Sequence, residues 1–208
     1  LSNAVDCSQA LKISHKDAFI CILPLFHSFA ATVCMNLPLL LGAKIVILKS
    51  VRPFKRVIRA IRKNRISIFV GIPSIYNILK DIKLPGILNT PLIKLFNPIR
   101  VCISGAAALP EETLVRFEKK FRIPLIEGYG LTEAGPNTFW LPKEEARHKI
   151  GSVGRPLFHV DVKIVDPRGN PVATGEAGEL LVRGPHVFGG YWNDPQATQA
   201  VLEQGWLH

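Results

Sequence analysis

The segment Ile126-Glu127-Gly128-Tyr129-Gly130-Leu131-Thr132-Glu133 decides how this sequence is interpreted. It continues a short apolar stretch that starts at Ile123, so it indicates a strand that runs into a tight loop. Glycines at 128 and 130 would permit backbone conformations that are closed to other residues, and a close approach to a ligand. We therefore expect a binding loop directly after a strand.

The side chains of this loop suit a nucleotide. Tyr129 would present a flat ring, while Thr132 and Glu133 supply a hydroxyl and a carboxylate of the kind found near phosphate and Mg²⁺. A structural alternative is a glycine-rich turn into a helix, with Thr132 as its N-cap and Glu133 in its first turn. A short motif does not decide between the two by itself.

Apolar and helix-like segments alternate through the first 150 residues. We expect strands at 17–25, 43–48, 67–71, 99–104 and 125–127, helices at 1–11, 27–41, 53–64, 73–81 and 110–121, and a loop with a short helix at 84–98. Such alternation is typical of a parallel sheet covered by helices, in which ligands bind beyond the carboxyl ends of the strands. The loops 104–108 and 128–133 both follow strands at that edge.

After residue 150 the pattern changes to short alternating segments joined by turns. Strands are expected at 160–165 and 179–183, and a last helix at 194–202 with Asp194 as its N-cap. The fold class is therefore α/β. Residues 1–150 are expected to form the parallel sheet with its helices, and residues 151–208 a small antiparallel, barrel-like subdomain.

Composition excludes several classes of protein. No apolar run in the 208 residues reaches the roughly 18 residues of a membrane span, and the start of the chain has no signal-peptide pattern. The cysteines fit no metal-binding spacing, and we expect buried free thiols in a reducing cytoplasm at Cys7, Cys21, Cys34 and Cys102. The chain does not begin with Met and stops after His208, so a piece of a longer protein is expected.

Positive charge is concentrated in one part of the chain. The net charge is +10, and residues 44–122 hold 17 Lys and Arg against 4 Asp and Glu. The densest run, 49–65, has eight cations, no acid, and apolar residues near helical spacing. Three roles stay open for it: the solvated face of a packed helix, attraction to anionic lipid or a polyanion, and steering of anionic ATP and CoA.

The run EGYGLTE resembles the signature loop of the AMP-forming adenylating enzymes, which comprise acyl-CoA synthetases, luciferases and peptide-synthetase adenylation domains. Other family-like segments follow the family's order over nearly the whole chain, at 23–27, 104–109, 151–156, 178–192 and 205–208. Leu131 stands where peptide-synthetase domains usually have Pro. Together with Pro-Leu-Phe-His-Ser-Phe at 24–29, it makes the chain most similar to a fatty-acid–CoA ligase, as an internal fragment of the large N-terminal domain.

The resemblance implies a role for each motif residue. Thr132, Glu133 and His27 would be catalytic: a phosphate contact, the Mg²⁺ ligand, and the side chain that orients the carboxylate. The nucleotide site would comprise Gly105, Ala106, Ala107, Glu127, Gly128, Tyr129, Gly130 and Thr132. Phe26, His27 and Gly130 would line the acyl pocket. Structural alternatives are close packing for the alanine run 106–108 and a core position for His27.

In this reading, the adenine lies between the alanine run and the Tyr129 ring, and Glu127 accepts a hydrogen bond from the adenine amino group. ATP, Mg²⁺ and CoA are the expected cofactor and co-substrates. The reaction would be activation of a carboxylic acid, with a fatty acid preferred, as acyl-AMP, followed by transfer to CoA. The protein is expected in the cytoplasm, with peripheral contact at the inner membrane face through residues 49–65.

Two alternatives stay open. One keeps the family but changes the acid to an aryl, amino or short-chain acid, with a carrier protein as acceptor. The other is a basic lipid- or nucleic-acid-binding module without catalysis, whose affinity would fall steeply with salt, although no nucleic acid is expected as a partner. No Ser/His/Asp arrangement and no Walker loop is found.

By the resemblance, several parts of the family's machinery would lie outside these 208 residues. The pyrophosphate loop would precede Leu1, and the ribose-binding Asp would follow His208. The C-terminal lid domain, with its catalytic lysine, would also be absent. The chain by itself is therefore expected to form no acyl-AMP at a useful rate.

Overall fold

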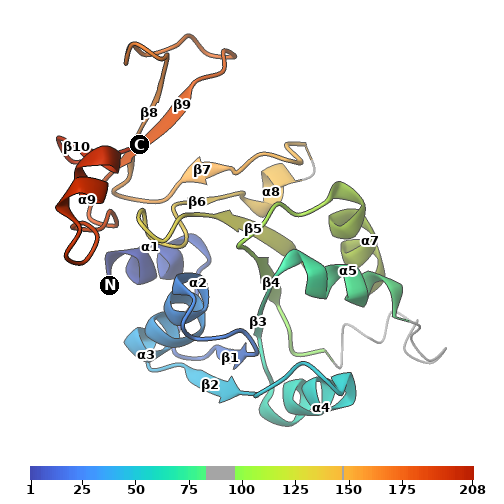
Figure 1. The fold of residues 1–208 in the computed structure, drawn as a ribbon. Coiled ribbons are helices and arrows are strands. Elements are labelled where there is room, and N and C mark those ends of the chain that lie inside the picture. Colours follow the sequence, from blue (N-terminus) through green and yellow to red (C-terminus); the bar gives the residue numbers. More distant parts are fainter. Residues whose placement is uncertain (83–96, 147) are drawn as a thin grey trace.

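The structure is a computed structural model that describes residues 1–82, 97–146 and 148–208 (Figure 1). The strands of its larger sheet are β1 (Ala18–Cys21), β2 (Lys44–Ile47), β3 (Ile68–Gly71), β4 (Val101–Ser104), β5 (Leu125–Tyr129), β6 (Phe139–Trp140) and β7 (Arg155–Pro156). They pair in the order β2-β1-β3-β4-β5-β6-β7, with β1 to β5 parallel and β6 and β7 antiparallel. The expected parallel sheet is confirmed.

Helices cover both faces of this sheet (Figure 1). On one face lie α1 (Ser2–Ala10), α2 (Ser28–Ala30), the π-helical segment η1 (Ala31–Asn36) and α3 (Leu37–Leu41); on the other lie α4 (Phe54–Asn64), α5 (Pro73–Asp81) and α7 (Glu111–Phe121). A short helix, α8 (Lys143–Ala146), follows β6. Because both faces are covered, every residue of β1, β3 and β4 is buried.

Alternation along the strands divides the apolar residues between two cores. Ile103 of β4 packs with the core under α1 to α3, and its neighbour Cys102 packs with the core under α4, α5 and α7. In β5, Ile126 and Leu125 are divided in the same way. The four cysteines are free and buried, as expected.

The helix expected at 27–41 is confirmed, but it begins one residue later and its middle part is π-helical. His27 has an extended backbone and precedes α2, and the helical run α2-η1-α3 ends at Gly42, which has a left-handed φ of 66°. The middle of the run is π-helical rather than α-helical. Its buried side chains, such as Phe29, Val33 and Leu37, belong to the core.

The smaller sheet is antiparallel. It pairs β10 (Leu202–Glu203), β11 (Trp206–Leu207), β9 (Glu179–Arg183) and β8 (Asp161–Val165) in that order, and α9 (Pro195–Val201) precedes β10. The Asp194 side chain accepts a 2.9 Å hydrogen bond from the Ala197 N–H, so it caps α9 as expected. Val182 and Leu207 pack with Phe139, which joins this sheet to β6.

Some boundaries differ from the expectation. The strand expected at 17–25 ends at Cys21, and the strand expected to end at Glu127 continues to Tyr129. Strand β7 pairs with β6, so the larger sheet continues to Pro156, past the expected division at residue 150. The short helix expected at 84–98 lies almost wholly outside the described residues.

Candidate functional site

Three loop segments meet at the carboxyl edge of the parallel strands: 22–28, which follows β1 and ends at Ser28, the first residue of α2; 105–109, after β4; and 130–133, after β5. The Leu109 N–H donates a 2.9 Å hydrogen bond to Glu127 Oε1, which joins the second loop to β5. The hydroxyl oxygens of Ser28 and Thr132 lie 3.2 Å apart, which joins the first loop to the third. The motifs that the sequence singled out therefore lie together.

Glu127 is the central residue of β5, where its side chain is half-buried. Burial raises the pKa of this carboxyl above its ordinary value, and the hydrogen bond from the Leu109 N–H partly opposes that shift. Since that bond uses Oε1, the other oxygen can accept a hydrogen bond from a ligand.

The expectation that Gly128 and Gly130 adopt backbone conformations closed to other residues is wrong, and their close approach to a ligand stays a prediction. Neither residue has a positive φ. A Cβ on Gly128 would lie 2.1 Å from Asn137 Oδ1, and a Cβ on Gly130 would lie 2.4 Å from the carbonyl carbon of Pro136. The backbone at 135–136 therefore leaves no room for a side chain at position 130, and the Asn137 side chain occupies the space that a side chain at position 128 would need.

The loop after β4 has two different parts. A Cβ on Gly105 would lie 2.7 Å from Cζ of Phe29, so the loop packs tightly against α2 at this point. Ala106 has a φ of 69°, a left-handed conformation that costs a non-glycine residue about 1–2 kcal/mol. The side chains of residues 106–108 are exposed, so close packing does not account for the alanines. Strain of this kind is often found at ligand-binding loops.

Thr132 is exposed, and no helix follows it: residues 130–138 form turns and bends that lead into β6. The alternative in which Thr132 caps a helix is therefore wrong. The carboxylate of Glu133 accepts a 2.8 Å hydrogen bond from the Tyr191 hydroxyl, and its backbone carbonyl accepts one of 2.8 Å from the Phe188 N–H. Sequence reasoning gave no role to Tyr191 or Phe188, although both lie in the family-like segment 178–192.

The Tyr129 ring packs beside Phe139, with ring centroids 5.9 Å apart, and is half-buried. It borders a small cavity of about 40 Å³ between the end of β5 and the smaller sheet, where Leu180 and Val182 also lie. Phe139 thus supports the ring from the neighbouring strand. Stacking of the ring on an adenine stays a prediction.

His27 and Phe26 lie at the surface beside the Ser28–Thr132 contact. His27 is exposed, so the alternative of a core histidine is wrong. Phe26 is 85% exposed, and its ring centroid lies 4.6 Å from that of His27. The acyl-pocket role of Phe26, His27 and Gly130 stays a prediction.

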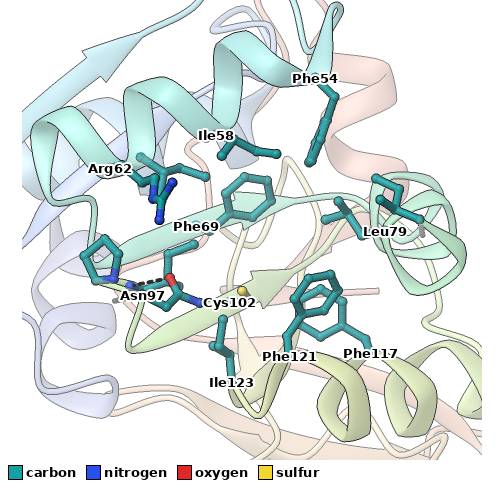
Figure 2. Close-up of a pocket in the computed structure, with 14 residues that line it drawn as sticks. Phe54, Ile58, Arg62, Phe69, Leu79, Asn97, Cys102, Phe117, Phe121 and Ile123 are labelled. Carbon is teal, nitrogen blue, oxygen red and sulfur yellow. Dashed lines mark hydrogen bonds between the residues drawn. The ribbon is translucent and has the colours of Figure 1, made fainter. Parts of the chain in front are cut away.

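A larger cavity of about 190 Å³ lies elsewhere, between α4, α5 and α7 (Figure 2). Its lining is almost wholly apolar, with rings from Phe54, Phe69, Phe117 and Phe121, and Arg62 is the one charged side chain among the described residues that line it. Ile99 and Ile123 border it, and they precede β4 and β5. The cavity therefore lies toward the amino ends of these strands, away from the motif loops, and none of Phe26, His27 and Gly130 lines it.

The side chains at this site could hold Mg²⁺ together with the phosphates of a nucleotide. Across the part of the chain that the structure describes, no group of three or more His, Cys, Asp and Glu side chains could form a metal site. Glu133 offers one carboxylate beside the Thr132 hydroxyl, and Mg²⁺ is commonly held by one or two carboxylates together with phosphate oxygens and water. The residues present fit a metal that arrives with a nucleotide.

Comparison with known proteins shows the family to which the chain belongs. The family model described as AMP-binding enzyme matches residues 1–192. A long-chain-fatty-acid–CoA ligase from Bacillus subtilis is 37% identical over 193 residues, which cover 89% of this chain and 32% of that protein. A feruloyl-CoA synthase from an Amycolatopsis species is 34% identical over 206 residues, 99% of this chain and 40% of that protein.

Among solved structures, O-succinylbenzoate coenzyme A synthetase from Bacillus subtilis in complex with ATP and a magnesium ion has a TM-score of 0.85 and 25% identity. The match covers 99% of this chain and 41% of that one. This chain belongs to the AMP-binding enzyme family. It spans between about a third and two fifths of the length of these relatives.

Proposed function

We propose that this chain forms the nucleotide-binding part of an AMP-forming acid–CoA ligase. A carboxylate oxygen of the acid attacks the α-phosphorus of ATP, and pyrophosphate leaves. The CoA sulfur then attacks the acyl carbonyl, and AMP leaves. The observation that carries the proposal is a pair of contacts that brings the motif segments together: the Leu109 N–H donates a hydrogen bond to Glu127 of β5, and the hydroxyl oxygens of Ser28 and Thr132 lie 3.2 Å apart.

Each loop has a task in binding the nucleotide. The adenine lies against the exposed backbone of 106–108, and the Tyr129 ring covers its other face, a stacking contact of about 1–3 kcal/mol. Glu127 accepts the hydrogen bond from the adenine amino group through the oxygen that Leu109 leaves free. The glycines at 105, 128 and 130 contribute by allowing these backbone segments to lie close to the rest of the fold.

The reacting groups lie at the other end of the site. The Thr132 hydroxyl, 3.2 Å from that of Ser28, donates to a phosphate oxygen, and His27 orients the carboxylate of the acid from the same loop as Ser28. Glu133 is the proposed ligand of Mg²⁺, which when bound neutralises charge on the phosphates. Phe26 and Gly130 form the adjoining wall of the acyl pocket.

A fatty acid is the proposed substrate class. The support is the 37% identity to a long-chain-fatty-acid–CoA ligase, together with the apolar 28–41 run. An aryl acid is the second candidate, since the 34% identity to feruloyl-CoA synthase extends over 99% of the chain. Pyrophosphate release by the full-length protein with C8–C18 fatty acids and with hydroxycinnamic acids separates the two candidates.

We also propose a cytoplasmic protein that contacts the inner membrane face. Helix α4 exposes Lys55, Arg56, Arg59, Arg62 and Lys63, and within the described residues none of them forms an ion pair. In the part of the chain that the structure describes, no helix has both the length and the apolar character needed to cross a bilayer. Binding to vesicles with anionic phosphatidylglycerol, weakened by salt and absent with neutral lipid, would support this contact; equal binding to both vesicles would refute it.

Calorimetry with AMP on the 208-residue chain tests the proposed nucleotide site. Binding that is lost in Glu127→Ala supports the proposal. Heat changes that are the same in the parent chain and in the variant would contradict it. Because the chain spans only part of its relatives, we expect binding without turnover, and pyrophosphate release is measured as a separate readout.

A further inference from the structure

Glu133 is held at two points by one segment of the chain that lies more than fifty residues away. The Phe188 N–H donates a 2.8 Å hydrogen bond to the Glu133 carbonyl, and the Tyr191 hydroxyl donates a 2.8 Å hydrogen bond to Glu133 Oε1. The first bond fixes the backbone and the second fixes the carboxylate. Oε2 of Glu133 accepts no hydrogen bond from the described residues, so it is available to a ligand.

The segment 184–191, which makes both bonds, is itself anchored at each end. At the first end, His186 Nε2 lies 2.8 Å from an oxygen of Asp6 in α1, and both side chains are 1% exposed. At the second end, the Tyr191 N–H donates a 2.8 Å hydrogen bond to Thr198 Oγ1 in α9. The segment is therefore connected to α1 near its first end and to α9 at its second end.

The Tyr191 ring is also fixed in direction. It lies edge-on to Phe188 with ring centroids 4.9 Å apart, and this contact orients the hydroxyl toward Glu133. Tyr191 itself is 39% exposed and belongs to neither core of the larger sheet. Loss of its hydroxyl would therefore remove the bond to Glu133 without opening a cavity in a core.

We propose that Tyr191 is a positioning residue, which holds the Glu133 carboxylate so that its free oxygen points at the Mg²⁺ of a bound Mg–ATP complex. The inference rests on the proposed function. A donor on Oε1 restricts rotation of the carboxylate, and such outer-shell partners of metal ligands are commonly worth 10- to 100-fold in metal affinity. The smaller sheet thereby contributes to the site through the connection that follows β9.

The test is calorimetric binding to the 208-residue chain and to its Tyr191→Phe variant. Two ligands are compared: AMP without metal, and ATP over a series of Mg²⁺ concentrations. In Tyr191→Phe the Mg²⁺ concentration for half-maximal enhancement of ATP binding should rise about 10-fold or more. The AMP affinity should change by less than about twofold, because AMP does not need the metal.

Trp192→Phe is the matched control, because Trp192 is adjacent, aromatic and 91% exposed. It should leave both measurements unchanged. In a Glu133→Gln background, Tyr191→Phe should have no further effect on the Mg²⁺ dependence, since the two residues act as a pair. An additive effect in this cycle would overturn the proposal.

Three other results would overturn the inference. They differ in whether they also overturn the proposed function. An unchanged Mg²⁺ dependence in Tyr191→Phe removes the role of Tyr191 and leaves the proposed function intact. Equal losses of AMP binding, ATP binding and thermal stability, or a variant that does not fold, would show that Tyr191 is structural. No nucleotide binding by the parent chain would overturn the proposed function, and the inference with it.

Discussion

The backbone N–H of Leu109 lies 2.9 Å from Oε1 of Glu127 and donates a hydrogen bond to it. This bond ties the loop after β4 to the neighbouring strand β5, at the edge where Ser104 and Glu127 are register partners. A carboxylate that is half-buried and shared in this way has one oxygen left for a ligand. The bond therefore shapes the proposed adenine site before any nucleotide binds.

Glu127 should make adenosine binding depend on pH. Burial raises the pKa of its carboxyl, and the protonated form is the weaker acceptor for an adenine amino group. Affinity for adenosine should therefore fall as pH decreases from about 7 through the raised pKa. Titration calorimetry with adenosine, which lacks a titrating phosphate, measures this directly.

The Glu127→Gln variant is the control for that dependence. Its amide oxygen can still accept the hydrogen bond from the Leu109 N–H, but it does not titrate. Adenosine affinity of this variant should change little between about pH 7 and pH 5. A variant profile as steep as that of the parent would assign the dependence to another group.

Gly130→Ala should destabilise the fold and abolish nucleotide binding. The added Cβ would lie 2.4 Å from the Pro136 carbonyl carbon, and a backbone group cannot move aside as the end of a flexible side chain can. We expect a loss of about 1–3 kcal/mol in the free energy of unfolding. Urea unfolding, followed by circular dichroism, gives the value.

Gly189→Ala is the matched control, because a Cβ there would meet nothing within 4 Å and Gly189 has no positive φ. The free energy of unfolding of this variant should stay within about 0.5 kcal/mol of that of the parent. Similar losses in both variants would mean that the close approach at 135–137 does not matter for stability.

Asp17→Ala should be strongly destabilising. Its carboxylate accepts hydrogen bonds of 2.8 and 2.9 Å from Arg100 and one of 2.7 Å from Ser67, and it connects the starts of β1, β3 and β4. The Asp17 side chain is 8% exposed but that of Arg100 is 40% exposed, so we expect a cost of about 1.5–3 kcal/mol, the range for hydrogen bonds to a charged group. Asp161→Ala, which breaks the exposed pair with Arg183, should cost less than about 1 kcal/mol.

Because of the Asp17 carboxylate, we also expect the stability of the fold to decrease at acidic pH. Burial raises the pKa of Asp17, but the hydrogen bonds from Arg100, Ser14 and Ser67 outweigh burial, so the pKa is lowered overall. A lowered folded pKa contributes stability above the unfolded value of about 4, and that contribution is lost as pH falls through the folded pKa. In Asp17→Ala, the loss of unfolding free energy below about pH 4 should be smaller than in the parent.

His186 should make the stability of the fold depend on pH in a second range, above that of Asp17. Burial lowers the pKa of its imidazole, although Asp6 opposes the shift; His159 and the amino terminus also face it and lower the pKa further. The folded protein then binds fewer protons than the unfolded chain, so stability should fall as pH decreases from about 6.5 through the lowered pKa.

Denaturant titrations at about pH 7.5 and pH 5.5 measure the contribution of His186. The His186→Gln variant should be less stable at the higher pH and should lose less between the two. If it loses as much stability as the parent, the titrating group is not His186.

The sequence alone determined most of the elements and the family. The helix at 73–81 and the strand at 179–183 agree with the expectation at both ends, and Asp194 caps α9. These features depend on local signals, such as a proline in the first turn, apolar spacing and a capping side chain. The ordered motifs also indicated the family, because each motif is itself a short contiguous segment.

Only the tertiary structure decided which groups meet. It showed that the glycines at 128 and 130 are required by the chain passing at 135–137, and that Tyr191 holds the Glu133 carboxylate. It also placed an apolar cavity of about 190 Å³ between α4, α5 and α7, away from the motif loops. These contacts join residues that are up to 58 positions apart, and they depend on how sheets and loops pack, which no local pattern of residues encodes.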